Sequence, residues 1–416
     1  MKKLTNIVLF CTISLLFFTS EVKSEILRGP YTEGLGQDSA IVMFESAYET
    51  PAWLEYGIEP NCSQIMSFSE NQEFHKIYLY GLVPNQQFCY KAYIFNEDKS
   101  GLLPPIEGKF RTLRSGDRKV MNFSIFGNTF SLSEVNKMLM AQTMLKLDSD
   151  FVVHTGNLTY SGSSQEEADI QFFSPFKDLL VQQPLFINVG KNEYGTTLED
   201  RQDKRFLRNN FNKLHIMPWS AGTPRYYSLN SANAKLLFLD ASDLESAKAA
   251  PSIEKTSEQI KWLRLELSKA GDMWKIIFIN HPLYPKEDLQ FSKKLQTILA
   301  PTMQAYKVNL VVHGYEQQYM RTEPIKYTSY NDHHVTHINI GGQEGASVEF
   351  DDNLKSYIKA QGNWKLEKKA KDIKGDYIER NYTAPHFANV KIVDRKLILT
   401  VYNLEGKIVD KVEVYK

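Results

Sequence analysis

Five polar loops follow buried apolar runs, and they hold the side chains best suited to chemistry. The loops are Phe126-Gly-Asn128-Thr, Thr155-Gly-Asn157-Leu-Thr-Tyr160, Val189-Gly-Lys191-Asn192-Glu193-Tyr194, Ile279-Asn-His281-Pro-Leu-Tyr284 and His313-Gly-Tyr315-Glu-Gln317-Gln-Tyr319-Met-Arg321. Functional groups in layered α/β proteins tend to lie in loops just beyond the carboxyl ends of strands. Amide, imidazole, phenol and ammonium groups in this pattern indicate one shared polar site.

The elements that must position these loops lie in residues 119–416. Their apolar runs are Phe123–Phe126, Phe151–His154, Leu185–Val189, Leu236–Leu239, Ile276–Ile279, Leu310–Val312 and Val335–Ile340. Between these runs, the stretches Ser131–Leu147 and Glu258–Ala270 have helical spacing, with Ile260, Leu263 and Leu267 on one face. The alternation predicts layered α and β structure.

Residues 25–115 show a different pattern. Short β-type runs alternate with turn residues at Ala40–Phe44, Ala52–Tyr56, His75–Leu79, Phe88–Ile94 and Gly108–Thr112. Within the fourth run, Phe88, Tyr90 and Ala92 alternate onto the more apolar face, which we expect to pack inward. The pattern predicts a small all-β sandwich.

The first 24 residues have the features of a secretory signal. Lys2 and Lys3 precede a short apolar run, and Val22 and Ser24 suit a cleavage site. We therefore expect export to an extracellular or periplasmic space, with no membrane span in the mature chain. Cleavage would remove Cys11. The remaining pair, Cys62 and Cys89, would form a disulfide in an oxidising compartment, with two free thiols as the alternative.

The overall charge argues against one class of partner. The 416 residues contain 49 Lys and Arg against 49 Asp and Glu, so the formal net charge is zero. A nucleic-acid-binding protein needs a basic surface to displace counterions, and the balance here predicts no nucleic-acid partner. A charged segment around residues 349–380 mixes both signs and is most simply a solvated insertion.

In order and spacing, the five loops resemble the motif blocks of the metallophosphoesterases, specifically the purple acid phosphatases. Those blocks contain Gly-Asp, Gly-Asp-x-x-Tyr, Gly-Asn-His-Asp/Glu, His-x-Pro-x-Tyr and Gly-His-x-His-x-Tyr-Glu-Arg patterns. The Leu79–Tyr93 run also resembles a fibronectin type III module. The resemblance implies a fibronectin type III-like sandwich, followed by a four-layer α/β/β/α calcineurin-like phosphoesterase domain with a dinuclear iron, zinc or manganese centre.

The motifs are degenerate at the positions where the family binds its metals. The matching residues are Asn128, Asn157, Tyr160, Lys191, His281, Tyr315 and Gln317. The family has two Asp, one Tyr, one Asn and three His there, so only Tyr160 and His281 are retained. The His that would protonate the leaving group is replaced by Asn192, and Glu193 keeps the acidic place after it.

These replacements change the charge of the ligand shell. Two Asp-to-Asn changes remove two negative charges and Lys191 adds a positive one, a shift of about +3 that opposes binding of two neighbouring cations. An Asn192 amide does not titrate near neutral pH and cannot act as a general acid. We therefore expect no cofactor and an inactive substitution at Asn192.

The leading hypothesis is a catalytically silent, exported relative that acts by binding. Lys191, His281, Tyr160, His154 and Arg321 are the candidate residues for binding phosphate or a phosphoester.

One alternative is an acid phosphatase with a single or remodelled metal site. Its candidate ligands are His281, Tyr160, Asn157 and Glu193, or the group His333, His334 and His337. A second alternative is that the β-sandwich binds a protein partner, with residues 116–416 as a platform.

Overall fold

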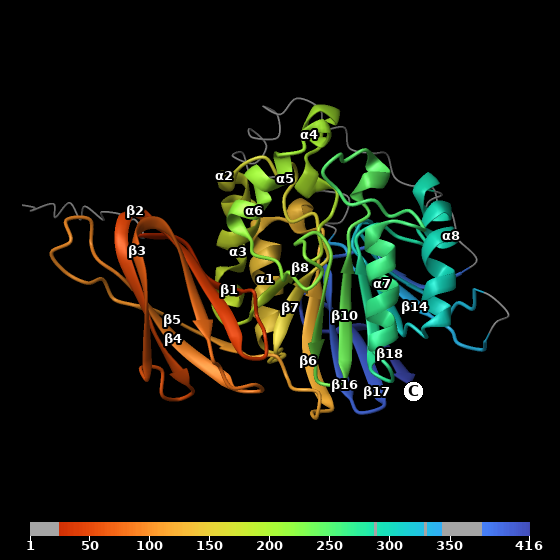
Figure 1. The fold of residues 1–416 in the computed structure, drawn as a ribbon, viewed down its shortest axis with the longest axis horizontal. Coiled ribbons are helices and arrows are strands. Elements are labelled where there is room, and N and C mark those ends of the chain that lie inside the picture. Colours follow the sequence, from red (N-terminus) through yellow and green to blue (C-terminus); the bar gives the residue numbers. More distant parts are fainter. Residues whose placement is uncertain (1–24, 287–288, 328–330, 343–376) are drawn as a thin grey trace, which may run out of the picture.

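The computed structural model describes residues 25–286, 289–327, 331–342 and 377–416 (Figure 1). The predicted signal segment lies outside these ranges. An antiparallel five-stranded sheet forms the amino-terminal part, with strand order β1-β2-β4-β5 and β3 paired to β2. Its strands are β1 (Ile26–Glu33), β2 (Ser39–Ile58), β3 (Ile65–Tyr80), β4 (Gln87–Ile94) and β5 (Ile106–Arg111).

The predicted runs Ala40–Phe44 and Ala52–Tyr56 belong to one long strand, β2. A register shift between Glu45 and Ala52 interrupts its pairing with β3, where two separate strands were expected. On β4, Phe88, Tyr90 and Ala92 are buried, which confirms the predicted inward face. Cys62 and Cys89 form the predicted disulfide, with a Cα–Cα distance of 5.0 Å.

Two further sheets form the rest of the molecule (Figure 1). The six-stranded sheet has the order β18-β17-β16-β6-β7-β8, and the seven-stranded sheet has the order β15-β13-β14-β12-β11-β10-β9. The strands of the first are β6 (Val120–Phe126), β7 (Phe151–His154), β8 (Leu185–Ile187), β16 (His386–Val393), β17 (Lys396–Asn403) and β18 (Ile408–Tyr415). Those of the second are β9 (Tyr227–Ser231), β10 (Ala234–Leu239), β11 (Trp274–Ile279), β12 (Leu310–His313), β13 (Tyr319–Thr322), β14 (Thr336–Asn339) and β15 (Ile378–Tyr382).

Alternation along the central strands separates two apolar cores. On β10, Leu236 and Phe238 belong to the core between the two sheets, whereas Leu237 and Leu239 belong to a second core beneath helices. Rings of the two sheets approach each other in the first core, where Phe123 and Phe278 have centroids 6.4 Å apart. Fully buried strands need apolar residues on both faces, which explains their continuous apolar runs.

Helices cover the outer faces of both sheets, giving four layers (Figure 1). The helices are α1 (Glu134–Leu145), α2 (Gln165–Ala168), α3 (Ser174–Leu180), α4 (Leu198–Gln202), α5 (Phe206–Asn209), α6 (Phe211–Leu214), α7 (Glu258–Lys269) and α8 (Gln290–Ala305). α7 begins after Ser257, whose side chain caps the amide of Ile260. Ile260, Leu263 and Leu267 are buried as predicted.

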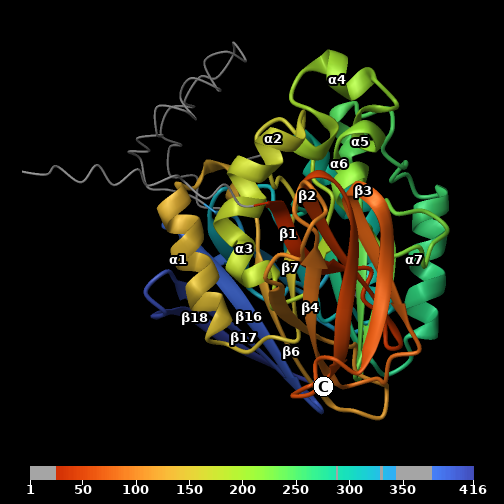
Figure 2. The same cartoon turned by 90° about the vertical axis from the view of Figure 1, so that its left-hand side faces the viewer.

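Figure 2 shows the amino-terminal sheet in front of the layered part, and polar side-chain contacts join the two. Arg28 on β1 donates to the Asp169 carboxylate at 2.6 and 2.8 Å. The Tyr31 hydroxyl donates to the Leu214 carbonyl at 2.6 Å, and Glu33 contacts His215 at 2.7 Å. These contacts fix the β1 edge of the sheet against the layered part.

Some predicted boundaries change. Residues 349–376 of the predicted insertion lie outside the described ranges, but Ile378–Arg380 are part of β15, which pairs with β13. The predicted run Val335–Ile340 corresponds to β14, which begins at Thr336 and ends at Asn339. No helix in the described part of the chain is long and apolar enough to cross a membrane.

Candidate functional site

The polar loops converge because the strands before them run parallel. β6, β7 and β8 are parallel neighbours, as are β10, β11 and β12. The carboxyl ends of parallel strands lie at the same edge of a sheet. Asn128, Asn157 and Lys191 follow the first three strands, while His281 and Tyr315 follow β11 and β12. The structure therefore brings most of the predicted site residues to one edge.

Asn128 and Asn157 occupy the two positions where the family pattern has carboxylates, and a hydrogen bond links their side chains. The Asn157 side-chain amide donates to Asn128 Oδ1 at 3.2 Å, and the Asn192 backbone amide donates to Asn157 Oδ1 at 3.1 Å. Asn128 and Asn157 are buried and have φ of 52° and 57°, a left-handed conformation that Asn tolerates well. Both amide oxygens thus accept hydrogen bonds within the protein.

Glu193 holds the loops after β7 and β8 together. Its carboxylate accepts hydrogen bonds from the backbone amides of Asn157, Leu158 and Gly190 at 3.0, 2.8 and 2.7 Å. Burial raises the pKa of this carboxyl, against the lowering effect of the three amides. Glu193 is therefore a positioning residue, and its oxygens are directed at backbone amides.

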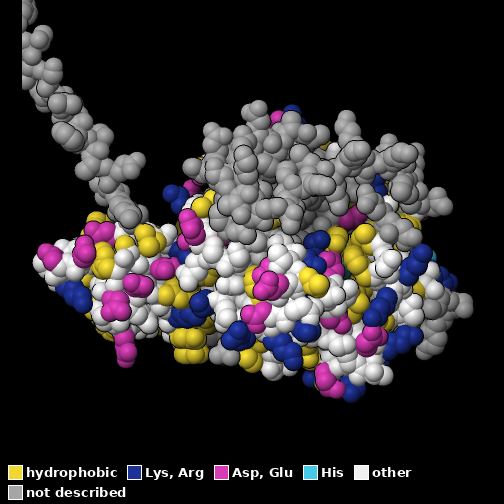
Figure 3. All heavy atoms as spheres, turned by 90° about the horizontal axis from the view of Figure 1, so that it is seen from above, with side chains coloured by type: hydrophobic (Ala, Val, Ile, Leu, Met, Phe, Trp, Pro, Cys, Tyr) yellow, Lys and Arg dark blue, Asp and Glu magenta, His cyan; other side chains and the backbone are white. Residues whose placement is uncertain are grey.

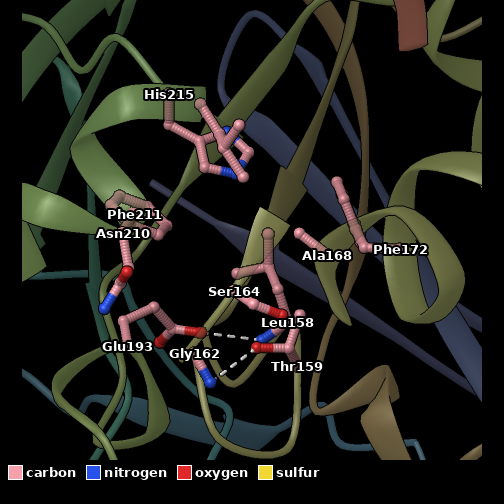
Figure 4. A pocket seen from close by; sticks show the side chains of 11 residues that line it. Leu158, Thr159, Gly162, Ser164, Ala168, Phe172, Glu193, Asn210, Phe211 and His215 are labelled. Atoms are coloured by element: carbon pink, nitrogen blue, oxygen red, sulfur yellow. Dashed lines mark hydrogen bonds between the residues drawn. The ribbon is translucent and has the colours of Figure 1, made fainter. Parts of the chain in front are cut away.

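Asn192 is also directed into the protein. Its side-chain amide donates to the Thr159 carbonyl at 3.0 Å, and the residue is buried. Figure 4 shows Glu193 beside a small cavity with walls from Leu158, Phe172 and Phe211. The lining of this cavity is mainly apolar. It does not include Lys191, nor Tyr315 and Glu245, which contact the Lys191 side chain.

Lys191 contacts an aromatic ring and an acid. Its ammonium nitrogen donates to the Tyr315 hydroxyl at 3.0 Å and lies 4.3 Å from the centre of the Tyr315 ring. The same nitrogen is 3.9 Å from Glu245 Oε2. The Lys191 charge is thus stabilised by a cation–π contact and by a carboxylate.

The polar cluster consists of Lys191, Arg201, Glu245, His281 and Tyr315. Glu245 is its central acid, and the sequence interpretation missed it. Besides Lys191, it is contacted by Arg201 Nη1 at 3.4 Å and by His281 Nε2 at 3.3 Å. Burial alone would raise its pKa, but His281, Lys191 and Tyr315 lower it to about 2. The carboxylate is therefore ionised at neutral pH.

Glu245 lies in a short helical turn, Ser242–Glu245, that follows β10. A loop after the buried run Leu236–Leu239 could have indicated a site residue by the same rule as the other five. Arg201, on α4, carried no such signal, because its 3.4 Å contact with Glu245 joins residues 44 positions apart in the chain.

His281 is fully buried between the rings of Phe291 and Tyr315, whose centroids are 5.0 and 5.3 Å from its own. Neither of its ring nitrogens has a hydrogen-bond partner among the described residues. The 3.3 Å approach of Nε2 to Glu245 is a close contact without hydrogen-bond geometry. Its imidazole nevertheless borders the cluster through this contact.

The structure does not bring Arg321 and His154 into the cluster. Arg321 Nε donates to Asp410 at 2.7 Å, and its guanidinium also pairs with Glu379, so it joins the two sheets. The amide of Gly156 donates to His154 Nδ1, which leaves Nε2 to donate to the Thr129 hydroxyl at 3.1 Å. Both side chains are thus held by partners within the protein.

Two other predicted residues, Tyr160 and Gln317, are only partly buried. Tyr160 is half-buried with its ring 5.9 Å from that of Phe130, and burial raises its pKa. Gln317 is half-buried in the loop after β12.

The histidines of the alternative metal site do not converge. His333 Nε2 lies 2.6 Å from the Val308 carbonyl, whereas His337 Nδ1 lies 3.0 Å from His313 Nε2 inside the protein. His334 is exposed. In the described ranges, no group of three or more His, Cys, Asp or Glu residues is placed to hold a metal ion.

The donor set at the family positions does not fit a dinuclear metal centre. Two neighbouring cations need anionic oxygens and neutral imidazoles around them. Here the Asn128 and Asn157 oxygens accept protein hydrogen bonds, and the Lys191 ammonium approaches Tyr315 and Glu245. The cluster is instead an ion network with two cationic side chains and one carboxylate.

Comparison with known proteins gives a consistent resemblance, although no family model matches the chain. It is 23% identical over 219 residues to purple acid phosphatase 1 of Ipomoea batatas, covering 50% of this chain and 44% of that protein. It is 24% identical over 220 residues to a purple acid phosphatase of Glycine max, covering 50% and 45%. The chain thus matches less than half the length of these two relatives.

Solved structures extend the similarity to most of the chain. A purple acid phosphatase from yellow lupin (Lupinus luteus) seeds has a TM-score of 0.68 at 15% identity, covering 93% of this chain and 74% of that one. PhoD has a TM-score of 0.65 at 11% identity, covering 91% of both chains. At these identities the structural similarity establishes the fold.

Proposed function

We propose that this chain, which is purple acid phosphatase-like in sequence and a metallophosphoesterase in fold, is a catalytically silent protein that acts by binding. One observation carries the proposal. A lysine ammonium, held by Tyr315 and Glu245, lies where the family pattern places a metal-ligand amide. A fixed cation there opposes the binding of a second, mobile cation.

The chemistry of phosphoester hydrolysis supports the same conclusion. A dinuclear centre acidifies a water molecule and polarises the phosphoryl oxygens, which are its two main contributions. The residues present do not fit such a centre. In addition, the place of the general acid is taken by Asn192, whose amide is buried against the Thr159 carbonyl. These side chains therefore supply neither the ligands for the metal centre nor the general acid of the family reaction.

The cluster is an anion-binding arrangement whose anion is a side chain of the protein. Lys191, Arg201 and Tyr315 all approach the Glu245 carboxylate. Donors of these kinds are also the ones that would bind the oxygens of a phosphate. An external anion must therefore displace the Glu245 carboxylate before it can use these groups. We propose weak phosphate or phosphoester binding at this place.

We also propose export to an extracellular or periplasmic space. The Cys62–Cys89 disulfide supports this location, because such bonds persist in oxidising compartments. On the face seen in Figure 3, Lys and Arg side chains are interspersed with Asp and Glu, and we propose no polyanion partner.

The test of silence is metal content together with turnover. Purified protein would be incubated with iron, zinc or manganese salts, desalted, and analysed by mass spectrometry for metal. Hydrolysis of p-nitrophenyl phosphate would then be measured from acidic to mildly basic pH. We expect sub-stoichiometric metal and no turnover above that of the buffer.

A contaminating phosphatase could imitate activity, so a His281→Ala variant prepared in parallel is the control. Stoichiometric metal with turnover that is lost in His281→Ala would overturn the proposal and favour a hydrolase with a remodelled metal site. Turnover that is equal in both preparations would be assigned to contamination.

A further inference from the structure

β3 (Ile65–Tyr80) forms an open edge of the amino-terminal sheet. Within the described ranges it pairs with β2 alone, so the backbone groups along its other side have no strand partner (Figure 2). The strand has 16 residues, which is long for an edge. Natural proteins usually shorten, charge or cover such edges, because they pair readily with other strands.

The outward face of this edge is unusually apolar. Met66, Phe68, Tyr78 and Tyr80 are 59%, 70%, 47% and 71% exposed. The register shifts near Gln72 divide the strand, but on each side of them these even-numbered residues are the exposed ones, whereas Ile77 and Leu79 point into the core. Two of them, Tyr78 and Tyr80, stack with ring centroids 6.3 Å apart.

The sequence of β3 is complementary to itself when two copies run antiparallel. Where the free edge keeps one register past the shifts near Gln72, a two-fold axis at Glu73 places residues that are equally distant from Glu73 opposite each other. Met66 then faces Tyr80, Phe68 faces Tyr78 and Glu70 faces Lys76. Apolar residues oppose apolar ones and a negative charge opposes a positive one, twice in each symmetric pair.

We propose that the free edge of β3 is an interaction surface for a second copy of this chain, joining the two amino-terminal sheets into one continuous antiparallel sheet. The self-matching charges favour a second copy over an unrelated strand, because they place Glu70 and Lys76 opposite each other without any other sequence. The single like-charge contact is that of Glu73 with Glu73 of the second copy.

Pairing along β3 would leave the other contacts of the amino-terminal sheet unchanged. The other edge of the sheet, with β1 and its contacts Arg28–Asp169 and Tyr31–Leu214, is buried against the layered part. The polar cluster is built from the loops after the strands of the layered part and includes no residue of β3. The inference is thus independent of the proposed function of the cluster.

The test is charge exchange in the full chain. Light scattering after size-exclusion chromatography would measure the mass of the wild type, Glu70→Lys and Lys76→Glu across a range of concentrations. Each variant alone would place like charges opposite each other, and we expect its dimer to dissociate about tenfold more readily. An equimolar mixture of the two variants restores both opposite-charge pairs and should dimerise like the wild type.

Thermal unfolding of each variant shows whether it is folded, and Phe68→Ser provides a second variant at an exposed apolar position. It should also weaken the dimer. A wild type that stays monomeric at about 100 µM, within the range of weak association, overturns the proposal. So does a wild type that forms only larger aggregates, or a mixture that associates no better than its components.

Discussion

At the scale of single residues, Glu245 decides the character of the candidate site. A cluster with Lys191, Arg201 and His281 alone would be a receptor for phosphate. Glu245 lies within 4 Å of all three and supplies the negative charge internally. The positive charge that the sequence predicted at Lys191 is therefore compensated by a carboxylate from the helical turn after β10.

Glu245→Gln should expose this receptor. The change keeps the side-chain shape and removes the competing charge, so we expect the affinity for inorganic phosphate to rise about tenfold at neutral pH. Isothermal titration of wild type and variant with phosphate provides the measurement. Glu258→Gln, at an exposed carboxylate on α7, is the matched control and should have no effect. An unchanged affinity in Glu245→Gln would show that the cluster is not an anion receptor.

At the scale of elements, the loops after β7 and β8 are fixed by one buried carboxylate. The Glu193 carboxylate accepts hydrogen bonds from three backbone amides. Glu193→Gln would replace one of its acceptor oxygens by an NH2 group, which donates. We expect a loss of about 2 to 3 kcal/mol in the free energy of unfolding, because at least one donor is left without an acceptor. Urea denaturation would measure it, with Glu199→Gln on α4 as an exposed control. A loss below about 0.5 kcal/mol would argue against this anchoring role.

The elements also show what the sequence could predict. The buried strands of the two facing sheets appear as continuous apolar runs, because both of their faces are covered, and all seven predicted runs overlap strands. β16, β17 and β18 were not predicted. Their residues alternate between buried and exposed, as in Val390, Lys391 and Ile392, and this weaker pattern follows a highly charged segment.

The site was predicted to a similar extent, and for a related reason. Residues that follow strands directly, such as Asn157, Lys191 and His281, could be placed from the order of the runs. Arg321 was predicted as part of the last loop but lies on β13, where Asp410 on β18 of the other sheet neutralises its charge. Such a partner is chosen by packing between elements distant in sequence, which local spacing does not contain.

At the scale of the whole molecule, buried histidines predict sensitivity to acid. Burial lowers the pKa of His75, His313 and His386 to about 4, and that of His154 and His337 well below the usual value. In the unfolded chain these groups have a pKa near 6.5. Their contribution to stability is therefore complete above pH 6.5 and is lost as the pH falls towards 4.

We expect the free energy of unfolding to fall by several kcal/mol between pH 7 and pH 5. Burial raises the pKa of Asp243 to about 6 and also raises the pKa of Glu193, Asp240 and Glu45, so these carboxyls act in the opposite direction and reduce the fall. Urea unfolding at the two pH values measures the difference. His75→Gln should reduce it by about 2 kcal/mol, whereas the exposed His334→Gln should leave it unchanged. Equal stability of the wild type at both pH values would contradict the prediction.

The ammonium of Lys191 has a consequence for how the molecule matures. A metal centre is completed only when ions are captured from the surroundings, so its assembly depends on their supply. Here the positive charge is part of the polypeptide, and its contacts with Tyr315 and Glu245 form as the chain folds. The loops around the cluster should therefore reach the same conformation in metal-starved cells and in the presence of chelators as in metal-rich ones.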